Sequence, residues 1–242
     1  MGVVTPVLRE QTWATWIIWV GLLAVAADAL VTRQFATAFV ALATLGLSLV
    51  PVVFARWAVI HVPASFMLAV VAFLGGTLFL GEVYDFYGRF WWWDLAMHGA
   101  SALGFGLVGF VLVFMMFQGD RFAAPHAAVA FFAFCFGLAI GTGWEVFEHG
   151  MDRVFGFNMQ KSGLDDTMGD LITDMGGAAA GALAGYAYLK GRQAAGLHRW
   201  IDEFIERNPR YFAKRGRTAA RHGALRDRPG RDTERTGRNG GD

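Results

Sequence analysis

Charged residues and cysteine are scarce in this sequence, and both shortages narrow the class of protein. Only 17% of the 242 residues are charged, whereas about a quarter are charged in an average soluble domain. The single cysteine, Cys135, excludes any disulfide within the chain, so the fold does not depend on an oxidising compartment. Because Cys135 lies in an apolar run, we expect it to pack as a small apolar residue.

Several motifs of familiar enzyme classes are also absent. The sequence contains no glycine loop of the nucleotide-binding type, no serine-centred nucleophile motif and no haem or disulfide-exchange signature. Its glycine runs lie inside apolar segments and are interpreted as packing positions. The few polar residues that remain therefore carry the functional signal.

Apolar residues are abundant. They make up 55% of the chain, and the mean hydropathy is positive. A membrane span needs about 20 mainly apolar residues, and six runs are long enough, which predicts an all-α integral membrane bundle with about six transmembrane helices. The runs are residues 13–31, 36–54, 61–81, 92–117, 126–148 and 166–189.

The first run has a second interpretation as a secretory signal. Arg9 precedes it, and Ala24-Val25-Ala26 resembles a small-residue cleavage site. Cleavage would leave five spans without changing the orientation of the others, because the C-terminal tail sets that orientation.

Lysine and arginine predict the orientation, since positively charged flanks of spans stay in the cytoplasm. The tail from Lys190 onward is rich in both, which predicts a cytoplasmic C-terminus and, with six spans, a cytoplasmic N-terminus. We therefore expect a multi-pass protein of the bacterial inner membrane. In this topology the ionisable residues at one set of span ends all lie on the non-cytoplasmic side. They are Asp28, Glu82, Asp85, Asp94, His98, Glu145, Glu148, His149, Asp165, Asp166, Asp170 and Asp174.

The pattern divides the chain into three parts. Residues 1–190 are the predicted transmembrane domain, with a polar site built from residues 80–178. Large apolar residues recur at helical spacing in residues 191–206, which predicts an amphipathic helix on the inner membrane surface. Residues 207–242 are rich in arginine and glycine, which predicts a disordered basic cytoplasmic tail. The expected partner is the lipid bilayer, and no nucleic acid is expected; the sequence leaves the oligomeric state open.

Carboxylates and histidines repeat at four-residue spacing near the ends of the last three runs. Residues four apart share one face of a helix, so three helices can each direct ligands toward a common interior. The predicted metal ligands are Asp94, His98, Glu145, Glu148, His149, Asp166, Asp170 and Asp174. A mixed set of histidine and carboxylate favours Zn, Mn or Fe, whereas an all-oxygen subset favours Mg or Ca.

Two of these carboxylates, Asp170 and Asp174, are placed about two turns inside the last run. An acidic side chain at the centre of a span costs roughly 2.5–3.5 kcal/mol on insertion scales. A bound cation, a histidine proton or a water-filled cavity would each offset the repulsion between several such groups.

Structural interpretations stay open for part of the set. Asp165 and Asp166 are suited to cap the N-terminus of the last span. Glu82, Asp85 and Asp152 fit ordinary interfacial charges, and His98 alone fits a buried hydrogen-bonding histidine. Glycines at four-residue spacing also predict close packing between spans five and six. These glycines are Gly137, Gly141, Gly177, Gly181 and Gly185.

Three segments resemble the YjdF-type family of uncharacterised bacterial inner-membrane proteins. They are WDLAMHGASALGFG at 93–106, GWEVFEHGMD at 143–152 and SGLDDTMGDLITDMGGAAAG at 162–181. More distantly, the pattern DLxxxxGGAAAGALAGY at 170–186 is similar to VanZ-like membrane proteins, a family linked to glycopeptide resistance, which often have Asn where Asp174 stands here. The resemblance covers about residues 80–186 and implies a compact helical membrane domain.

Three functions fit this sequence. The first is a metal-dependent membrane enzyme acting on a lipid or other amphiphilic substrate, with Glu145 and Asp174 as candidate catalytic residues. The second is an ion- or proton-coupled permease, and the third is a non-catalytic module that binds lipid headgroups or a partner protein. The inner halves of the last three runs carry few ionisable groups and no inverted repeat is evident, which favours the enzyme over the permease.

Overall fold

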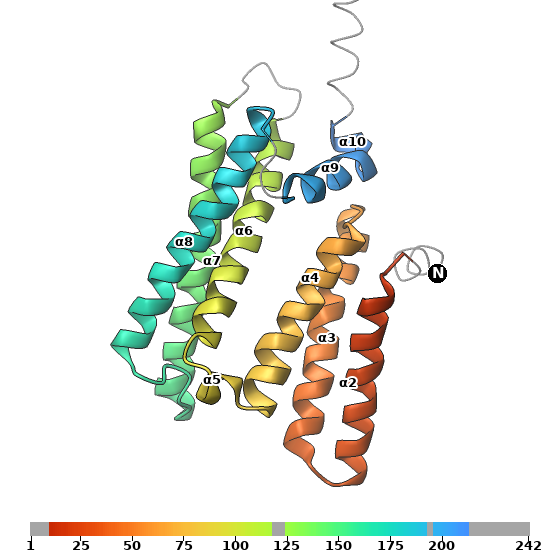
Figure 1. Ribbon diagram of the computed structural model, residues 1–242, viewed down its shortest axis with the longest axis vertical. Coiled ribbons are helices and arrows are strands. Elements are labelled where there is room, and N and C mark those ends of the chain that lie inside the picture. The colour runs from red at the N-terminus through yellow and green to blue at the C-terminus, as the bar shows by residue number, and fades with distance from the viewer. Residues whose placement is uncertain (1–9, 118–123, 193–195, 213–242) are drawn as a thin grey trace, which may run out of the picture.

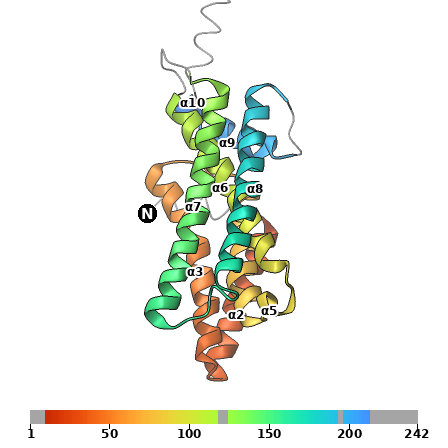
Figure 2. The ribbon, with the colours of Figure 1, turned by 90° about the vertical axis from the view of Figure 1, so that its left-hand side faces the viewer.

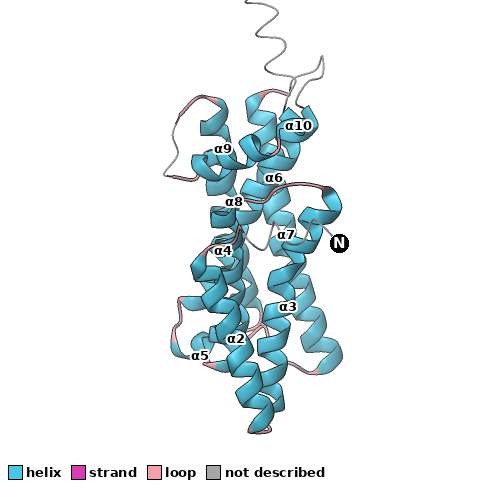
Figure 3. Ribbon diagram, turned by 90° about the vertical axis from the view of Figure 1, so that its right-hand side faces the viewer, coloured by secondary structure: helices cyan, strands magenta, loops and turns pink. Residues whose placement is uncertain are grey.

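The computed structural model describes residues 10–117, 124–192 and 196–212, and this part of the chain is helical without any strand (Figure 3). Within these described residues, five helices are long and apolar enough to cross a membrane. The prediction of an all-α membrane helical bundle is therefore confirmed. The five are α2 (Trp13–Val31), α3 (Phe35–Ala58), α4 (Ala64–Leu74) continued by the π-helical segment η1 (Gly75–Val83), α6 (Trp93–Phe117) and α7 (His126–Phe155).

The sixth predicted span corresponds to α8 (Leu164–Leu189). Its 26 residues are enough to cross a bilayer, but α8 is not among the helices apolar enough to qualify. The reason lies in its composition, because four aspartates and many glycines and alanines replace the large apolar side chains of the other helices. Its place in the bundle comes from packing against α6 and α7.

The helices form two groups (Figure 1). One contains α2, α3 and α4 with η1, and the other contains α6, α7 and α8, whose mutual contacts are the most extensive in the fold. Figure 2 shows α7 and α8 running side by side. The short helix α5 (Phe86–Arg89) connects the two groups at one end, where the Phe86 ring packs edge-on against Trp93 at 4.9 Å between centroids.

Glycines allow the backbones of α6 and α8 to touch. A Cβ atom at Gly106 would lie 2.9 Å from the carbonyl oxygen of Ala178, and one at Gly177 would collide with the carbonyl oxygen of Gly99. Such close approach is how helices pack in lipid, where no hydrophobic force joins them. The four-residue glycine pattern thus does mark packing positions: Gly177, Gly181 and Gly185 of α8 face α6, and Gly137 and Gly141 of α7 face α8.

The chain after α8 forms α9 (His198–Arg207) and α10 (Pro209–Phe212), which lie at the end opposite α5 (Figure 1). The apolar face of α9 packs against the bundle, since Ile201 is 2% exposed and shares a core with residues of α6 and α8. Helical structure continues past residue 206, since α9 ends at Arg207 and α10 follows it. Asn208, between the two helices, is buried and pairs with the backbone of His61, accepting a hydrogen bond of 2.7 Å and donating one of 2.8 Å. The rest of the predicted tail, 213–242, lies outside the described residues.

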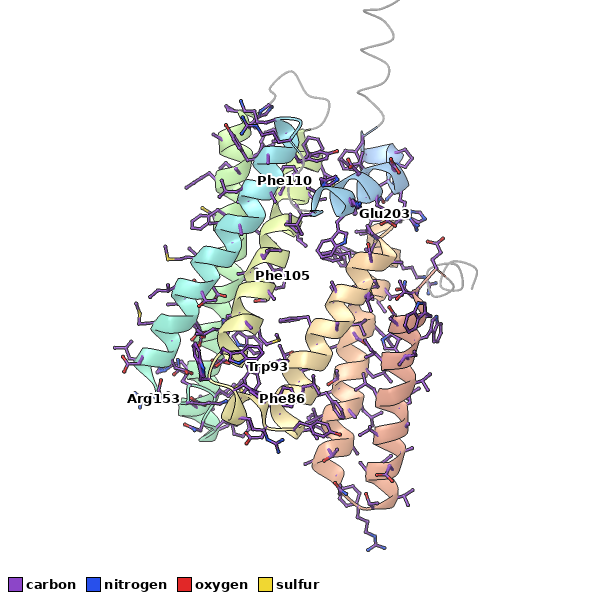
Figure 4. All side chains as sticks on the ribbon, viewed as in Figure 1. Phe86, Trp93, Phe105, Phe110, Arg153 and Glu203 are labelled. Carbon is purple, nitrogen blue, oxygen red and sulfur yellow. The ribbon has the colours of Figure 1, made fainter. Side chains whose placement is uncertain are left out.

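Because successive long helices run in alternating directions, the span ends at which the sequence predicts polar residues lie at the same end of the molecule as α5. Figure 4 places Phe86, Trp93 and Arg153 toward this end, and Phe110 and Glu203 toward the other. The acidic residues before and after α5, and those around the α7–α8 connection, therefore share one end of the bundle.

Candidate metal centre

His98 lies at the centre of a buried acidic cluster. It is 7% exposed and comes from the second turn of α6. Four carboxylates from three helices surround its ring: Asp94 from the same helix, Glu145 from α7, and Asp170 and Asp174 from α8. Glu145, Asp170 and Asp174 are 4%, 2% and 0% exposed, and Asp94 is partly exposed. The four-residue spacing explains this convergence, because each pair points from one helix face into the same interface.

The two ring nitrogens of His98 have different surroundings. Nδ1 lies 3.3 Å from Oδ1 and 3.4 Å from Oδ2 of Asp174, within hydrogen-bonding distance. Nε2 faces three oxygens at distances too long for hydrogen bonds. They are Glu145 Oε1 at 3.7 Å, Asp94 Oδ1 at 3.9 Å and Asp170 Oδ2 at 3.9 Å.

The spacing around Nε2 suits ligands of one cation better than partners of a hydrogen bond. Bonds of about 2.1 Å place tetrahedral ligand atoms about 3.4 Å apart. Ligand atoms of Asp94, His98 and Asp170 all lie within 4.8 Å of one another. Small side-chain rotations would therefore bring these three atoms into a shared coordination shell, and the Glu145 oxygen lies 3.7 Å from one of them, His98 Nε2.

Glu145 gives a second, independent sign of a missing partner. Both of its carboxylate oxygens are buried, and in the part of the chain that the structure describes neither accepts a hydrogen bond of ordinary geometry, although the Thr167 side chain interacts with this carboxylate. A buried polar group without a partner costs roughly 1–3 kcal/mol, and more when it is charged. Since Oε1 points toward His98, a cation between these groups would satisfy this carboxylate.

Three of the predicted ligands lie outside this shell. Glu148 is partly buried and accepts a hydrogen bond of 2.9 Å from the Trp144 indole. His149 is exposed, and its Nδ1 lies 3.0 Å from Oε1 of Gln160. Asp166 accepts a hydrogen bond of 3.1 Å from the backbone of Lys161. Of the eight predicted ligands, the structure gathers Asp94, His98, Glu145, Asp170 and Asp174.

The structural interpretations fare differently. The residue at the N-cap of α8 is Gly163, so neither Asp165 nor Asp166 occupies that position; both lie in the first turn, where Asp166 accepts the hydrogen bond from the Lys161 backbone just before the helix. Asp152 does have a structural role, because its two carboxylate oxygens accept hydrogen bonds from the backbones of Met159 and Gln160 at 2.7 and 2.9 Å. This fixes the turn that leads into α8.

Comparison with known proteins places the chain in a family without an assigned activity. A family model described as "Predicted membrane protein (DUF2238)" matches residues 13–191. The chain belongs to this family. The match includes all five residues of the cluster around His98. An uncharacterized protein of Thermotoga maritima is 31% identical over 131 residues, which cover 52% of this chain and 63% of that protein, so the chain spans less than two thirds of this relative. No solved structure matches.

Tyr87 of α5 is a residue of the site that sequence reasoning missed. Its ring fills the space beside Gly81, where a Cβ atom would collide with it, and Lys161 Nζ lies 4.5 Å from the ring centroid. Burial raises the pKa of the Tyr87 hydroxyl above its usual range, and the nearby carboxylates, Asp94 first among them, raise it further. No periodicity marks so short a helix, so only the three-dimensional packing of α5 reveals this position.

Proposed function

We propose that this protein is a membrane-embedded, metal-dependent enzyme that hydrolyses an ester or phosphoryl bond of an amphiphilic substrate. The observation that carries the proposal is the convergence of His98 Nε2 with three carboxylates, one of which, Glu145, has two buried oxygens that accept no hydrogen bond of ordinary geometry from the described residues. Asp94, Asp170 and Glu145 would hold a divalent cation together with His98. A donor set of one imidazole and three carboxylates suits Zn, Mn or Fe better than Mg.

Charge supports a cation at this position. Four carboxylates and one histidine share a small, largely buried volume between α6, α7 and α8. Even with a protonated imidazole, three negative charges would remain uncompensated, and Coulomb repulsion between close charges is strong where water is excluded. A divalent cation bound by the neutral imidazole would lower the net charge to −2 and would place its positive charge directly between the facing oxygens, the Glu145 oxygen that approaches Nε2 among them.

The reaction follows from the chemistry that such a cation supplies. A bound divalent metal polarises a carbonyl or phosphoryl oxygen and lowers the pKa of bound water to about 7. Glu148 lies close enough to Glu145 and Asp94 to interact with both electrostatically, and it is not needed as a ligand. It would take a proton from the attacking water as the new bond to phosphorus or carbon forms. The bond to the leaving alkoxide breaks, and the alkoxide receives that proton.

The position of the cluster favours an amphiphilic substrate. Asp94 lies in the first turn of α6 and is partly exposed, so the site opens toward the end of the bundle where the spans meet the interfacial region. A lipid or an isoprenoid phosphate could place its headgroup there while its chain stays in the bilayer. The predicted orientation would make this the non-cytoplasmic face of the inner membrane.

A permease fits less well. Beyond Asp174, the packing of α6 on α8 leaves no space even for a methyl group at several glycines, including Gly106 and Gly181. A pathway for ions along this interface would need polar groups and water, and the described helices instead place backbone against backbone there. The acidic cluster therefore ends inside the bundle.

Elemental analysis of detergent-purified protein tests the proposal. We expect one divalent transition metal per wild-type chain, and we expect Glu145→Gln and Asp170→Asn to lose it while keeping their helix content. Glu148→Gln is the matched control on α7, which should keep the metal but lose turnover of lipid or isoprenoid phosphates. Metal retained in both ligand variants, or no metal in the wild type under any loading condition, would overturn the metal site. Bound metal without turnover of any ester or phosphate substrate would leave a binding module and reject the enzyme.

A relation to two families of membrane proteins is also part of this proposal. We infer from the segments at 93–106, 143–152 and 162–181 that the chain is related to YjdF-type proteins and, more distantly, to VanZ-like proteins. All the cluster residues lie inside these segments. Activity on an amphiphile would be a shared property of such proteins if the cluster is their functional centre.

A further inference from the structure

We propose that Asp174 is a positioning residue that holds the imidazole of His98, and that Gly141 of α7 forms the notch that admits its carboxylate. This deepens the proposed function, because it divides the acidic cluster into cation ligands and one carboxylate behind the histidine. It rests on the metal site of that proposal and not on the hydrolytic reaction.

The first argument is the position of Asp174 relative to the ring. The two nitrogens of an imidazole point in different directions, and the structure puts Asp174 at Nδ1 while Asp94, Glu145 and Asp170 approach Nε2. Asp174 is fully buried, and both hydrogen-bonding contacts recorded for its carboxylate in the described chain go to His98. Its carboxylate is therefore committed to the far side of the ring from the other three.

The second argument is chemical. A histidine that binds a metal through one nitrogen commonly donates its other N–H to a carboxylate, which fixes the tautomer and makes the ligand nitrogen more basic. With Nδ1–H donated to Asp174, the lone pair of Nε2 points toward the three other oxygens. The arrangement of His98 and Asp174 is the one that this pairing requires.

The third argument comes from α7. Gly141 lies one turn before Glu145, and a Cβ atom at Gly141 would collide with Oδ2 of Asp174. The glycine therefore leaves room for a side chain from α8 at the position where α7 would otherwise fill the interface. Gly143 is exposed two residues later, and a Cβ atom there would meet nothing within 4 Å.

Metal affinity in the full-length purified protein tests this division of roles. Chelator competition with Zn²⁺ and absorption spectra of the Co²⁺-loaded protein are the two measurements. We expect Asp174→Asn to weaken metal binding by about 10–100-fold, the range typical for the loss of a carboxylate behind a ligating histidine. The Co²⁺ spectrum at saturation should stay close to that of the wild type, because no ligand is lost. Asp170→Asn should instead change the spectrum or abolish binding.

Gly141→Ala supplies the second variant, with Gly143→Ala as its matched control. We expect Gly141→Ala to weaken metal binding to a similar degree as Asp174→Asn, and the double variant to be little worse than either, since both act by displacing one carboxylate. Gly143→Ala should bind metal as the wild type does. Unchanged affinity in Asp174→Asn, or a Co²⁺ spectrum altered as much as in Asp170→Asn, would overturn the positioning role. Normal metal binding without turnover would reject the hydrolytic function and leave this role intact.

Discussion

At the scale of single residues, Tyr87 links the acidic cluster to the connection between the two helix groups. Its hydroxyl has a pKa raised by burial and then by carboxylates, including Asp94 and Asp170. A tyrosine in water is half ionised near pH 10. We therefore expect an ultraviolet difference titration between the wild type and Tyr87→Phe to show one tyrosine that remains protonated above that pH.

The sign of the effect on stability follows from linkage. The folded state holds the Tyr87 proton more tightly than the unfolded state, whose pKa is near the ordinary value of 10.0. Stability should therefore be unaffected by this group at neutral pH and should fall as the pH rises above about 10. Tyr87→Phe should lose less stability than the wild type over that alkaline range. A titration in which all tyrosines ionise together near pH 10 would contradict the environment assigned to Tyr87.

Residue spacing predicted the centre of the site better than its edge. The i, i+4 pairs placed Asp94 with His98 and Asp170 with Asp174 on inward faces, and the structure brings these four together with Glu145. Spacing alone could not show where α7 leaves the bundle. His149 has the same spacing from Glu145 but lies beyond the contact with α6 and α8, where Gln160 of the following loop meets it.

At the scale of whole elements, the contact between α6 and α8 fixes the position of one helix along the other, and so decides which of their polar residues lie side by side. Gly177 faces the carbonyl oxygen of Gly99, whereas Gly176 is exposed and has open space around it. We expect Gly177→Ala to lower the free energy of unfolding by about 1–3 kcal/mol, because a well-packed interface must open to admit the methyl group. Gly176→Ala should be neutral or raise it by up to about 1 kcal/mol, because alanine has the higher helix propensity.

Denaturation in mixed detergent micelles, followed by circular dichroism, compares the two alanine variants. Metal binding is measured on the same samples, since a shift between α6 and α8 would separate His98 from Asp170 and Asp174. Equal stability of both variants would show that the two helices are not in backbone contact at Gly99.

The elements themselves could be predicted in different degrees. Apolar runs of about 20 residues give the number and order of long helices, because each span must satisfy its own backbone in lipid. The α8 segment is harder to classify, because its aspartates and glycines serve packing and the site at the expense of apolarity. The packing of α9 against other helices could not be predicted from the sequence. The same amphipathic pattern is expected whether the apolar face of a helix contacts lipid or protein.

At the scale of the whole molecule, α9 and α10 connect the two helix groups at the end opposite the acidic cluster. Ile201 and Phe212 are buried against the group of α6, α7 and α8. On the other side, Asn208 bonds the backbone of His61, and Tyr211 donates a hydrogen bond of 3.0 Å to the carbonyl oxygen of Ala58. The connection between α3 and α4 is thus tied to the chain that follows α8.

Membrane topology is the property of the whole molecule that decides which compartment the cluster faces. Lys161 and Arg192 are exposed residues at opposite ends of α8, so a cysteine at each position reports whether α8 crosses the membrane. Cys135 is the only native cysteine and can be replaced by alanine to give a silent background. We expect a membrane-impermeant thiol reagent to label Lys161→Cys in intact spheroplasts and Arg192→Cys only after permeabilisation.

This result would follow if the basic residues beyond α8 keep that end in the cytoplasm, as the distribution of lysine and arginine predicts. The opposite pattern of labelling would keep α8 as a span and place the acidic cluster on the cytoplasmic face, where it would meet cytoplasmic substrates and metal pools. Labelling of both cysteines from outside would show that α8 does not cross the bilayer. The cluster would then lie between two true spans and one helix that enters and leaves on the same side, a geometry in which Asp170 and Asp174 need far less compensation for their charge.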